Sequence, residues 1–493
     1  MQMNQAALVE KYLFLQRKAV DALIDLYQNL GFNDSDLAIN VKVLGELCQH
    51  REASVLGNAL VSAEHAKKGN WEALDVMERQ IALGMSAHKS ADNPSLRLGG
   101  LMHLPPILDA IQGAALSIPL SVLPINKNCV KSVALIVSNL SQGAATTLVA
   151  RKFIKSLNDL GLDTYLLITG HDSLPNDDSI ELEIAGVKIF NIEQQTVYAR
   201  AQNLVQQALD LQLDAIIFYT WPTDIAAQIA SCKRMSLRQM FINHTCDQRL
   251  GAFDIRVSYT RDTAGLTDPQ RCYYVPPVRV REEKIEDVAH VSLSLWDIDE
   301  ATTIIGNYSR LSKCVDKAFM EAMVKILHRN PSVILMLPGL SDPDSEGILR
   351  AWFESNGLQK QVKFPGFLLE TYLPLLKVTR VYCDTFIWTG GQSVLDAMAM
   401  GVPVVSSKAA LGGTALDPTG VSPATLGSEL LPDSALVAES NSVDGYVAIV
   451  QRLLDDSEFH HFHKQQNIAR AEELSWHQYP RIVVELLNQL HVK

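Results

Sequence analysis

Short apolar runs alternate with longer stretches of helical periodicity from about residue 130 onward. A run too short for a buried helix, followed by a helix and then by another such run, is typical of parallel strands joined by crossover helices. Because helices would then cover both faces of the sheet, the pattern predicts an α/β fold with a doubly wound parallel sheet. The first block of expected strands comprises residues 133–138, 165–169, 187–192, 215–219 and 239–243.

A polar segment at residues 279–287 separates this block from a second one, and we expect it to be a linker. The strands expected in the second block are 302–306, 333–337, 362–364, 380–384 and 404–406. The helices expected between them are 316–329, 345–356, 372–378 and 393–400. Two tandem Rossmann-like domains would place a ligand cleft between them, because open parallel sheets bind ligands at the carboxyl ends of their strands.

Residues 1–125 have a different pattern, in which apolar positions recur every three or four residues and strand-like runs are almost absent. We therefore expect an N-terminal all-α accessory domain over residues 1–125. A first Rossmann-like domain would follow over 126–285 and a second over 286–475.

Composition and charge exclude several classes of function. With 493 residues, 47% of them hydrophobic, the chain can bury large cores. Its net charge is −12 and it has no Lys/Arg run, which argues against nucleic acid as a partner. The seven cysteines include no Cys-x-x-Cys pair, so neither a disulfide framework nor a cysteine zinc site is expected. No signal peptide or unbroken apolar span is visible, and we expect a cytoplasmic protein without an integral membrane segment.

A glycine-rich turn at residues 384–405 is the most specific motif of the chain. It has the pattern of a strand end, a turn, a short helix and the next strand. Gly390 and Gly391 would leave the first N–H groups of the helix open to close approach, which suits a diphosphate. Asp396, one turn into the helix, could accept hydrogen bonds from a ribose. The motif predicts a site for a nucleotide-sugar.

Two tandem Rossmann-like domains with this turn resemble the GT-B glycosyltransferases. The details resemble the group that contains the nucleocytoplasmic O-linked GlcNAc transferases and the bacterial adhesin-modifying N-glycosyltransferases. The resemblance covers about residues 240–280 and 302–406, and it is carried by the stretches 241–254, 307–313, 326–335 and 384–405. It implies the GT-B fold, hexosyl- or N-acetylhexosaminyltransferase activity, and a C-terminal helix within 476–493 that crosses to the first Rossmann-like domain.

The resemblance also implies that the donor is a UDP-sugar held by the second domain. Lys313 would meet the diphosphate, Asp396 the ribose and Tyr372 the uracil. The turn residues that would contact the phosphates are Gly390, Gly391, Gln392 and Ser393.

The sequence departs from the family at two places. Residues 390–393 read Gly-Gly-Gln-Ser where the family usually has Gly-His-Thr-Thr, and the loop at 138–145 lacks a histidine that some members have there. The sugar, the acceptor and the general base are therefore left open. Inversion at the sugar needs a group that takes the acceptor's proton, and His244 and Asp247, on one loop of the first domain, are the two candidates.

Two absences in the motifs bear on the mechanism. No Asp-x-Asp motif stands in a strand–loop context, so we expect no metal and no other cofactor, with Lys313 stabilising the leaving diphosphate. Retaining GT-B enzymes often carry Glu-x7-Glu across the glycine-rich turn. Here the position that would pair with Asp396 is Trp388, so inversion is expected.

The sequence thus predicts an inverting, metal-independent glycosyltransferase that moves a sugar from a UDP-sugar to an acceptor, with a protein side chain expected before a glycan. Two alternatives remain open. One is a UDP-sugar isomerase of the 2-epimerase type, which would convert the donor without an acceptor. The other is a GT-B-like subunit that binds a partner without catalysis.

Overall fold

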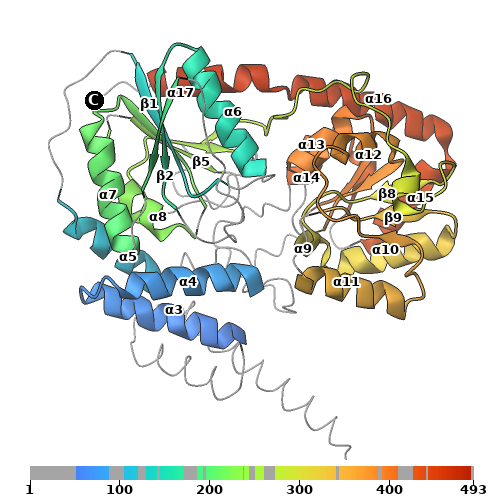
Figure 1. Cartoon of the computed structure of the whole chain (residues 1–493), viewed down its shortest axis with the longest axis horizontal. Coiled ribbons are helices and arrows are strands. Elements are labelled where there is room, and N and C mark those ends of the chain that lie inside the picture. Colours follow the sequence, from blue (N-terminus) through green and yellow to red (C-terminus); the bar gives the residue numbers. More distant parts are fainter. Residues whose placement is uncertain are drawn as a thin grey trace, which may run out of the picture.

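Two α/β domains lie side by side in the computed structural model, with β1–β7 in one domain and β8–β13 in the other (Figure 1). This arrangement confirms the predicted α/β class with two parallel sheets. The residues that the structure describes are 51–87, 105–119, 129–140, 145–170, 186–192, 196–221, 223–236, 238–243, 250–259, 272–339, 343–386, 391–408, 426–439 and 442–489.

The first domain is built on seven parallel strands in the order β3-β2-β1-β4-β5-β6-β7. The strands are β1 Ser132–Val137, β2 Asp163–Ile168, β3 Val187–Asn191, β4 Ala215–Tyr219, β5 Arg238–Asn243, β6 Ile255–Ser258 and β7 Cys272–Tyr274. Successive side chains of a strand point to opposite faces, so Leu135 and Ile136 of β1 enter two different hydrophobic cores. Both faces are covered, which is why β4 has only apolar or aromatic residues and buries all of them.

Helices cover the two faces of this sheet. Helix α6 (Ala145–Asp159) and α17 (Tyr479–Gln489) share one core with Leu135, through Phe153 and Val483. Helices α5 (Pro105–Ser117), α7 (Val197–Asp210) and α8 (Ile225–Ser231) share the core on the other face.

The second domain has six parallel strands in the order β10-β9-β8-β11-β12-β13. The strands are β8 Ile304–Gly306, β9 Ile334–Met336, β10 Val362–Lys363, β11 Val381–Cys383, β12 Val404–Ser407 and β13 Val437–Ala438. The helices are α9 Leu311–Cys314, α10 Lys317–Arg329, α11 Pro343–Ser355, α12 Tyr372–Val378, α13 Gln392–Ala399, α14 Leu426–Leu430, α15 Val443–Asp455 and α16 Ser457–Glu473. One continuous core holds the sheet and these helices together.

The helices before the first sheet pack directly on it. Helices α3 (Arg51–Lys67) and α4 (Ala73–Ala87) form a hairpin beneath the first domain (Figure 1). Leu60 of α3 and Met77 of α4 are fully buried in the same core as Phe218 of β4. Residues 1–50 of the expected accessory domain lie outside the described residues.

The end of the chain returns to the first domain. The Tyr479 hydroxyl, at the start of α17, lies 2.9 Å from that of Tyr259, next to β6. The indole of Trp476 donates to Ser156 of α6 over 2.9 Å. These contacts tie the two domains together, since α17 follows α16 of the second domain. Among the described helices, none has the length and hydropathy needed to cross a bilayer.

Candidate active site

Each sheet has one point at which the strand order reverses direction. In the first sheet this point lies between β1 and β4, and in the second it lies between β8 and β11. Loops that leave such neighbouring strands at their carboxyl ends diverge and form a ligand crevice. Four residues mark these strand ends: Ser138, Thr220, Asn307 and Asp384.

The loops that follow β4 and β8 contact each other across the two domains. Trp221 follows β4, and the guanidinium carbon of Arg310, between β8 and α9, lies 6.0 Å from the centre of its ring. A cation at this distance over an indole face is attracted by the electrons of the ring. The contact spans the two domains and places the loop after β8 opposite the loop after β4.

The glycine-rich turn leads into α13, whose N-cap is Gly391. This residue has φ +94° and ψ −170°, a conformation that is nearly restricted to glycine. A Cβ atom there would meet no heavy atom within 4 Å, so the backbone conformation, and not crowding, requires glycine. The first N–H groups of a helix have no partner within the helix, and they are suited to an anion. Gly390 lies outside the described residues.

The first two side chains of α13 bind protein groups. The amide of Gln392 donates to the carbonyl of Val278 over 2.7 Å and accepts from the N–H of Val280 over 3.0 Å. The hydroxyl of Ser393 accepts from Tyr382 over 2.9 Å. Gln392 therefore fastens the start of α13 to the segment that links the two domains. Because both side chains are engaged within the protein, the N–H groups at the start of α13 are the better candidates to bind an anion.

Asp396 forms a buried ion pair with the interdomain linker. Its side chain is 0% exposed, and its Oδ2 accepts from Nη1 of Arg281 over 2.8 Å. Nε of Arg279 lies 3.5 Å from its Oδ1. Burial raises the pKa of Asp396, while Arg281 and Arg279 oppose that shift. A ribose hydroxyl could take this oxygen only if Arg281, whose side chain is 28% exposed, moved away.

Tyr372 completes the cluster around Asp396. Its hydroxyl donates to Oδ2 of Asp396 over 3.3 Å, and the guanidinium of Arg281 lies 4.9 Å above its ring. Burial and the nearby carboxylate raise the pKa of Tyr372 well above its ordinary value, so the phenol keeps its proton. The side chains predicted to meet ribose and uracil thus lie together, and Arg281 contacts both.

Lys313 lies beside the carboxyl ends of β8 and β11. Burial lowers the pKa of its ammonium group, and the carboxylate of Asp384 partly opposes this shift. Asn307 joins the two strand ends, since its amide donates to the carbonyl of Cys383 over 2.8 Å and accepts from the N–H of Ser309 over 3.0 Å. The segment that leads into α9, the short helix with Lys313, is thereby held next to the strand that precedes the glycine-rich turn.

Residues 302–456, which include Lys313, Tyr372 and Asp396, match the family model described as "Glycosyl transferases group 1". A structure of an O-GlcNAc transferase mutant from Thermobaculum terrenum is similar over 99% of both chains, with 15% sequence identity and a TM-score of 0.61. The chain thus has the GT-B fold, and its second domain matches a glycosyltransferase family.

Other solved structures share the fold of the enzyme. HepE of Anabaena, in complex with UDP and glucose, is similar over 73% of this chain and 100% of its own, with 15% identity and a TM-score of 0.54. The sucrose-phosphate synthase of Thermosynechococcus elongatus is similar over 73% and 98%, with 16% identity and a TM-score of 0.55. No curated protein matches the enzyme in sequence.

The structure brings together Lys313, Tyr372, Gly391 and Asp396 of the enzyme at one end of its second sheet, and their roles stay predictions. His244 and Asp247, the candidate bases, lie outside the described residues. Within the described part of the chain, no three His, Cys, Asp or Glu side chains gather into a set that could hold a metal ion.

Sequence reasoning missed the linker arginines. Arg279 and Arg281 are two residues apart, which puts both side chains on one face of an extended segment, and this spacing was the available signal.

Proposed function

We propose that the enzyme transfers a sugar from a UDP-sugar to an acceptor that enters the cleft from the first domain. The observation that carries the proposal is the convergence of Lys313, Gly391 and Asp396 at the point where the second sheet reverses its strand order. The family model covers this domain. HepE, which shares the fold, has been solved with UDP and with UDP-glucose, and this supports uridine as the base.

The diphosphate would lie between the amino end of α13 and Lys313. The open N–H groups after Gly391 supply hydrogen-bond donors, and the helix dipole favours negative charge there. The Lys313 ammonium adds a full positive charge. As the bond to the sugar breaks, charge grows on the diphosphate, and these fixed groups stabilise it more strongly than they stabilise the ground state. This arrangement favours a reaction that needs no metal.

The ribose would bind by exchange at Asp396. In the structure Arg281 is hydrogen-bonded to Oδ2 of Asp396, and Arg281 is the more exposed partner of this ion pair. When the nucleotide enters, the ribose hydroxyls would replace Arg281 on this oxygen, and Tyr372 would remain beside it. Arg279, only 10% exposed, would stay near Oδ1 and keep the carboxylate from being left without a cation.

The acceptor side of the reaction follows from the sequence resemblance. We propose inversion at the sugar, with His244 or Asp247 taking the proton of the acceptor. The similarity to the Thermobaculum terrenum O-GlcNAc transferase extends over 99% of both chains and includes the amino-terminal helices. It supports a protein side chain as the acceptor.

A screen of UDP-sugars tests the proposal. The enzyme is incubated in EDTA with each UDP-sugar, with and without a library of Ser/Thr- and Asn-containing peptides, and UDP release and peptide mass are measured. Release of UDP that requires peptide, with a mass increase of one sugar, is the expected result. Conversion of the UDP-sugar to its epimer without peptide would favour the isomerase. If all UDP-sugars stay intact although UDP binds, the result would favour a GT-B-like binding subunit without catalysis.

A further inference from the structure

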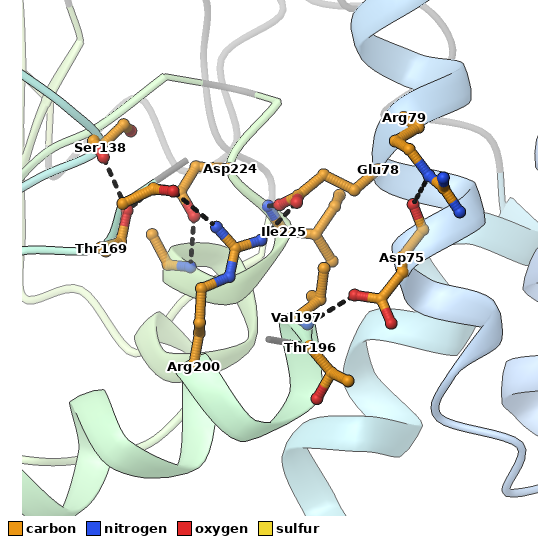
Figure 2. Close-up of polar contacts among 12 residues, drawn as sticks. Asp75, Glu78, Arg79, Ser138, Thr169, Thr196, Val197, Arg200, Asp224 and Ile225 are labelled. Atoms are coloured by element: carbon orange, nitrogen blue, oxygen red, sulfur yellow. Dashed lines mark hydrogen bonds and ion pairs between the residues drawn. The ribbon is translucent and has the colours of Figure 1, made fainter. Parts of the chain in front are cut away.

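Helix α4 places two carboxylates at the amino ends of two helices of the first domain (Figure 2). Asp75 accepts from the N–H of Val197, the first residue of α7, over 2.7 Å. Glu78 accepts from the N–H of Ile225, the first residue of α8, over 3.1 Å. Residues three apart lie on one face of a helix, so α4 can serve both helix ends at once. A carboxylate is favoured at such an end by the open N–H groups and by the helix dipole.

Glu78 also forms an ion pair with Arg200 of α7. Glu78 is 8% exposed and Arg200 is 7% exposed, so the pair is shielded from water. Arg200 donates further to the carbonyl of Gly170, just after β2, over 3.2 Å. A buried ion pair of this kind holds its elements in one relative position, because separating the partners would leave an uncompensated charge.

The polar contacts continue from α8 towards the cleft. Asp224, fully buried, caps α8 by accepting from the N–H of Ala227 over 2.9 Å. Its other oxygen lies 2.5 Å from the hydroxyl of Thr169, which is 3.0 Å from the carbonyl of Ser138 (Figure 2). The hydroxyl of Ser138 accepts from the N–H of Trp221 over 2.7 Å. A continuous set of contacts thus joins α4 to Trp221.

Trp221 is the partly exposed aromatic residue at the carboxyl end of β4, opposite Arg310 of the second domain. We propose that Trp221 contacts the substrate from the first domain, and that Glu78 is a positioning residue that fixes its place through Ile225 and Asp224. The amino-terminal helices then set one wall of the cleft. The proposal rests on the proposed function, in that it takes the region where Trp221 and Arg310 meet between the two domains as the place of sugar transfer.

The test uses the full chain labelled with 5-fluorotryptophan and followed by fluorine NMR. The chain has six tryptophans, and Trp221→Phe identifies the resonance of Trp221. Glu78→Gln keeps an acceptor for Ile225 but removes the charge that faces Arg200. The double variant E78L/R200M removes the ion pair without leaving a buried charge, which guards against failure to fold. Arg79→Met is the matched control, because Arg79 is exposed and donates to Asp75 within α4.

We expect the Trp221 resonance to shift in E78Q and in E78L/R200M and to stay in place in R79M. The resonance of Trp476, which packs against Phe153 on the opposite face of the sheet, should not move in any of them. A purely structural role for Glu78 would lower the melting temperature and leave the Trp221 resonance unchanged, and that result would overturn the positioning role.

Addition of UDP to the wild type tests the substrate contact. We expect the Trp221 resonance to shift as UDP saturates the enzyme. Binding of UDP, measured by calorimetry, without any shift of this resonance would refute the contact with substrate. Absence of UDP binding would instead refute the proposed function, and the ligand-free spectra of E78Q and E78L/R200M would still decide the positioning role.

Discussion

Replacing Arg281 by methionine should make UDP bind more tightly. The exchange proposed at Asp396 requires the nucleotide to displace Arg281, whose Nη1 lies 2.8 Å from Oδ2. Methionine keeps an unbranched apolar side chain next to the Tyr372 ring but has no charge, so Oδ2 is left to Tyr372 and the incoming ribose. The variant therefore removes the competitor and keeps the acceptor.

The size of the effect follows from the exposure of the pair. A hydrogen bond to a charged group contributes about 1.5–3 kcal/mol when it is shielded. The Arg281 side chain is 28% exposed, and solvent screening lowers this to about 1 kcal/mol. That difference corresponds to a dissociation constant about fivefold lower in the variant.

Calorimetric titration of UDP into the wild type and R281M measures this difference. Lys284→Met is the control, because Lys284 is exposed on the same linker and its loss removes the same charge. We expect K284M to bind UDP as the wild type does. Weaker binding of UDP to R281M would refute the exchange, since it would mean that Arg281 supports the nucleotide site instead of competing for it.

Three further predictions concern the diphosphate site. Lys313→Met should weaken UDP binding, measured by calorimetry, about tenfold or more, because a charged contact is lost. Lys325→Met is the control and should leave UDP binding unchanged, because it removes an exposed lysine that pairs with Asp444. Burial lowers the pKa of Lys313, so the wild type should lose UDP affinity as the pH rises, at pH values below the ordinary pKa of a lysine, because the ammonium loses its proton there. K313R should lack this loss, since its guanidinium stays charged. Identical pH profiles of the two proteins would contradict the assignment. Gly391→Ala should destabilise the turn by about 1–3 kcal/mol and weaken UDP binding, because φ +94° is strained for alanine. Gly347→Ala, in helix α11 with open space around it, should leave UDP binding in calorimetry unchanged and should not lower the melting temperature, because alanine favours a helix over glycine.

Most strands could be predicted because buried parallel strands are continuous apolar runs. The expected strand 215–219 coincides with β4, and 187–192 differs from β3 by one residue. Strand β6 was not predicted, since Arg256 interrupts its apolar run. That side chain is nonetheless buried, with its guanidinium 5.0 Å from the centre of the Phe253 ring. A contact of this kind depends on tertiary structure and leaves no periodic signal.

The candidate site was predictable only in part. The turn, Lys313, Tyr372 and Asp396 lie in segments whose local pattern marks them. Arg281, which pairs with Asp396, lies 115 residues away, in a polar segment whose composition is typical of an exposed linker. Glu78 likewise occupies one position of an amphipathic helix, and its contacts with Arg200 and Ile225 are set by how that helix packs. Long-range ion pairs of this kind need the fold before they can be inferred.

Titration of UDP in the presence of EDTA tests the central claim most directly. We expect saturable binding to one site in the micromolar range, weakened in K313M and unchanged in K325M. No heat with UDP, or equal binding in K313M and the wild type, would contradict a uridine diphosphate site at the amino end of α13.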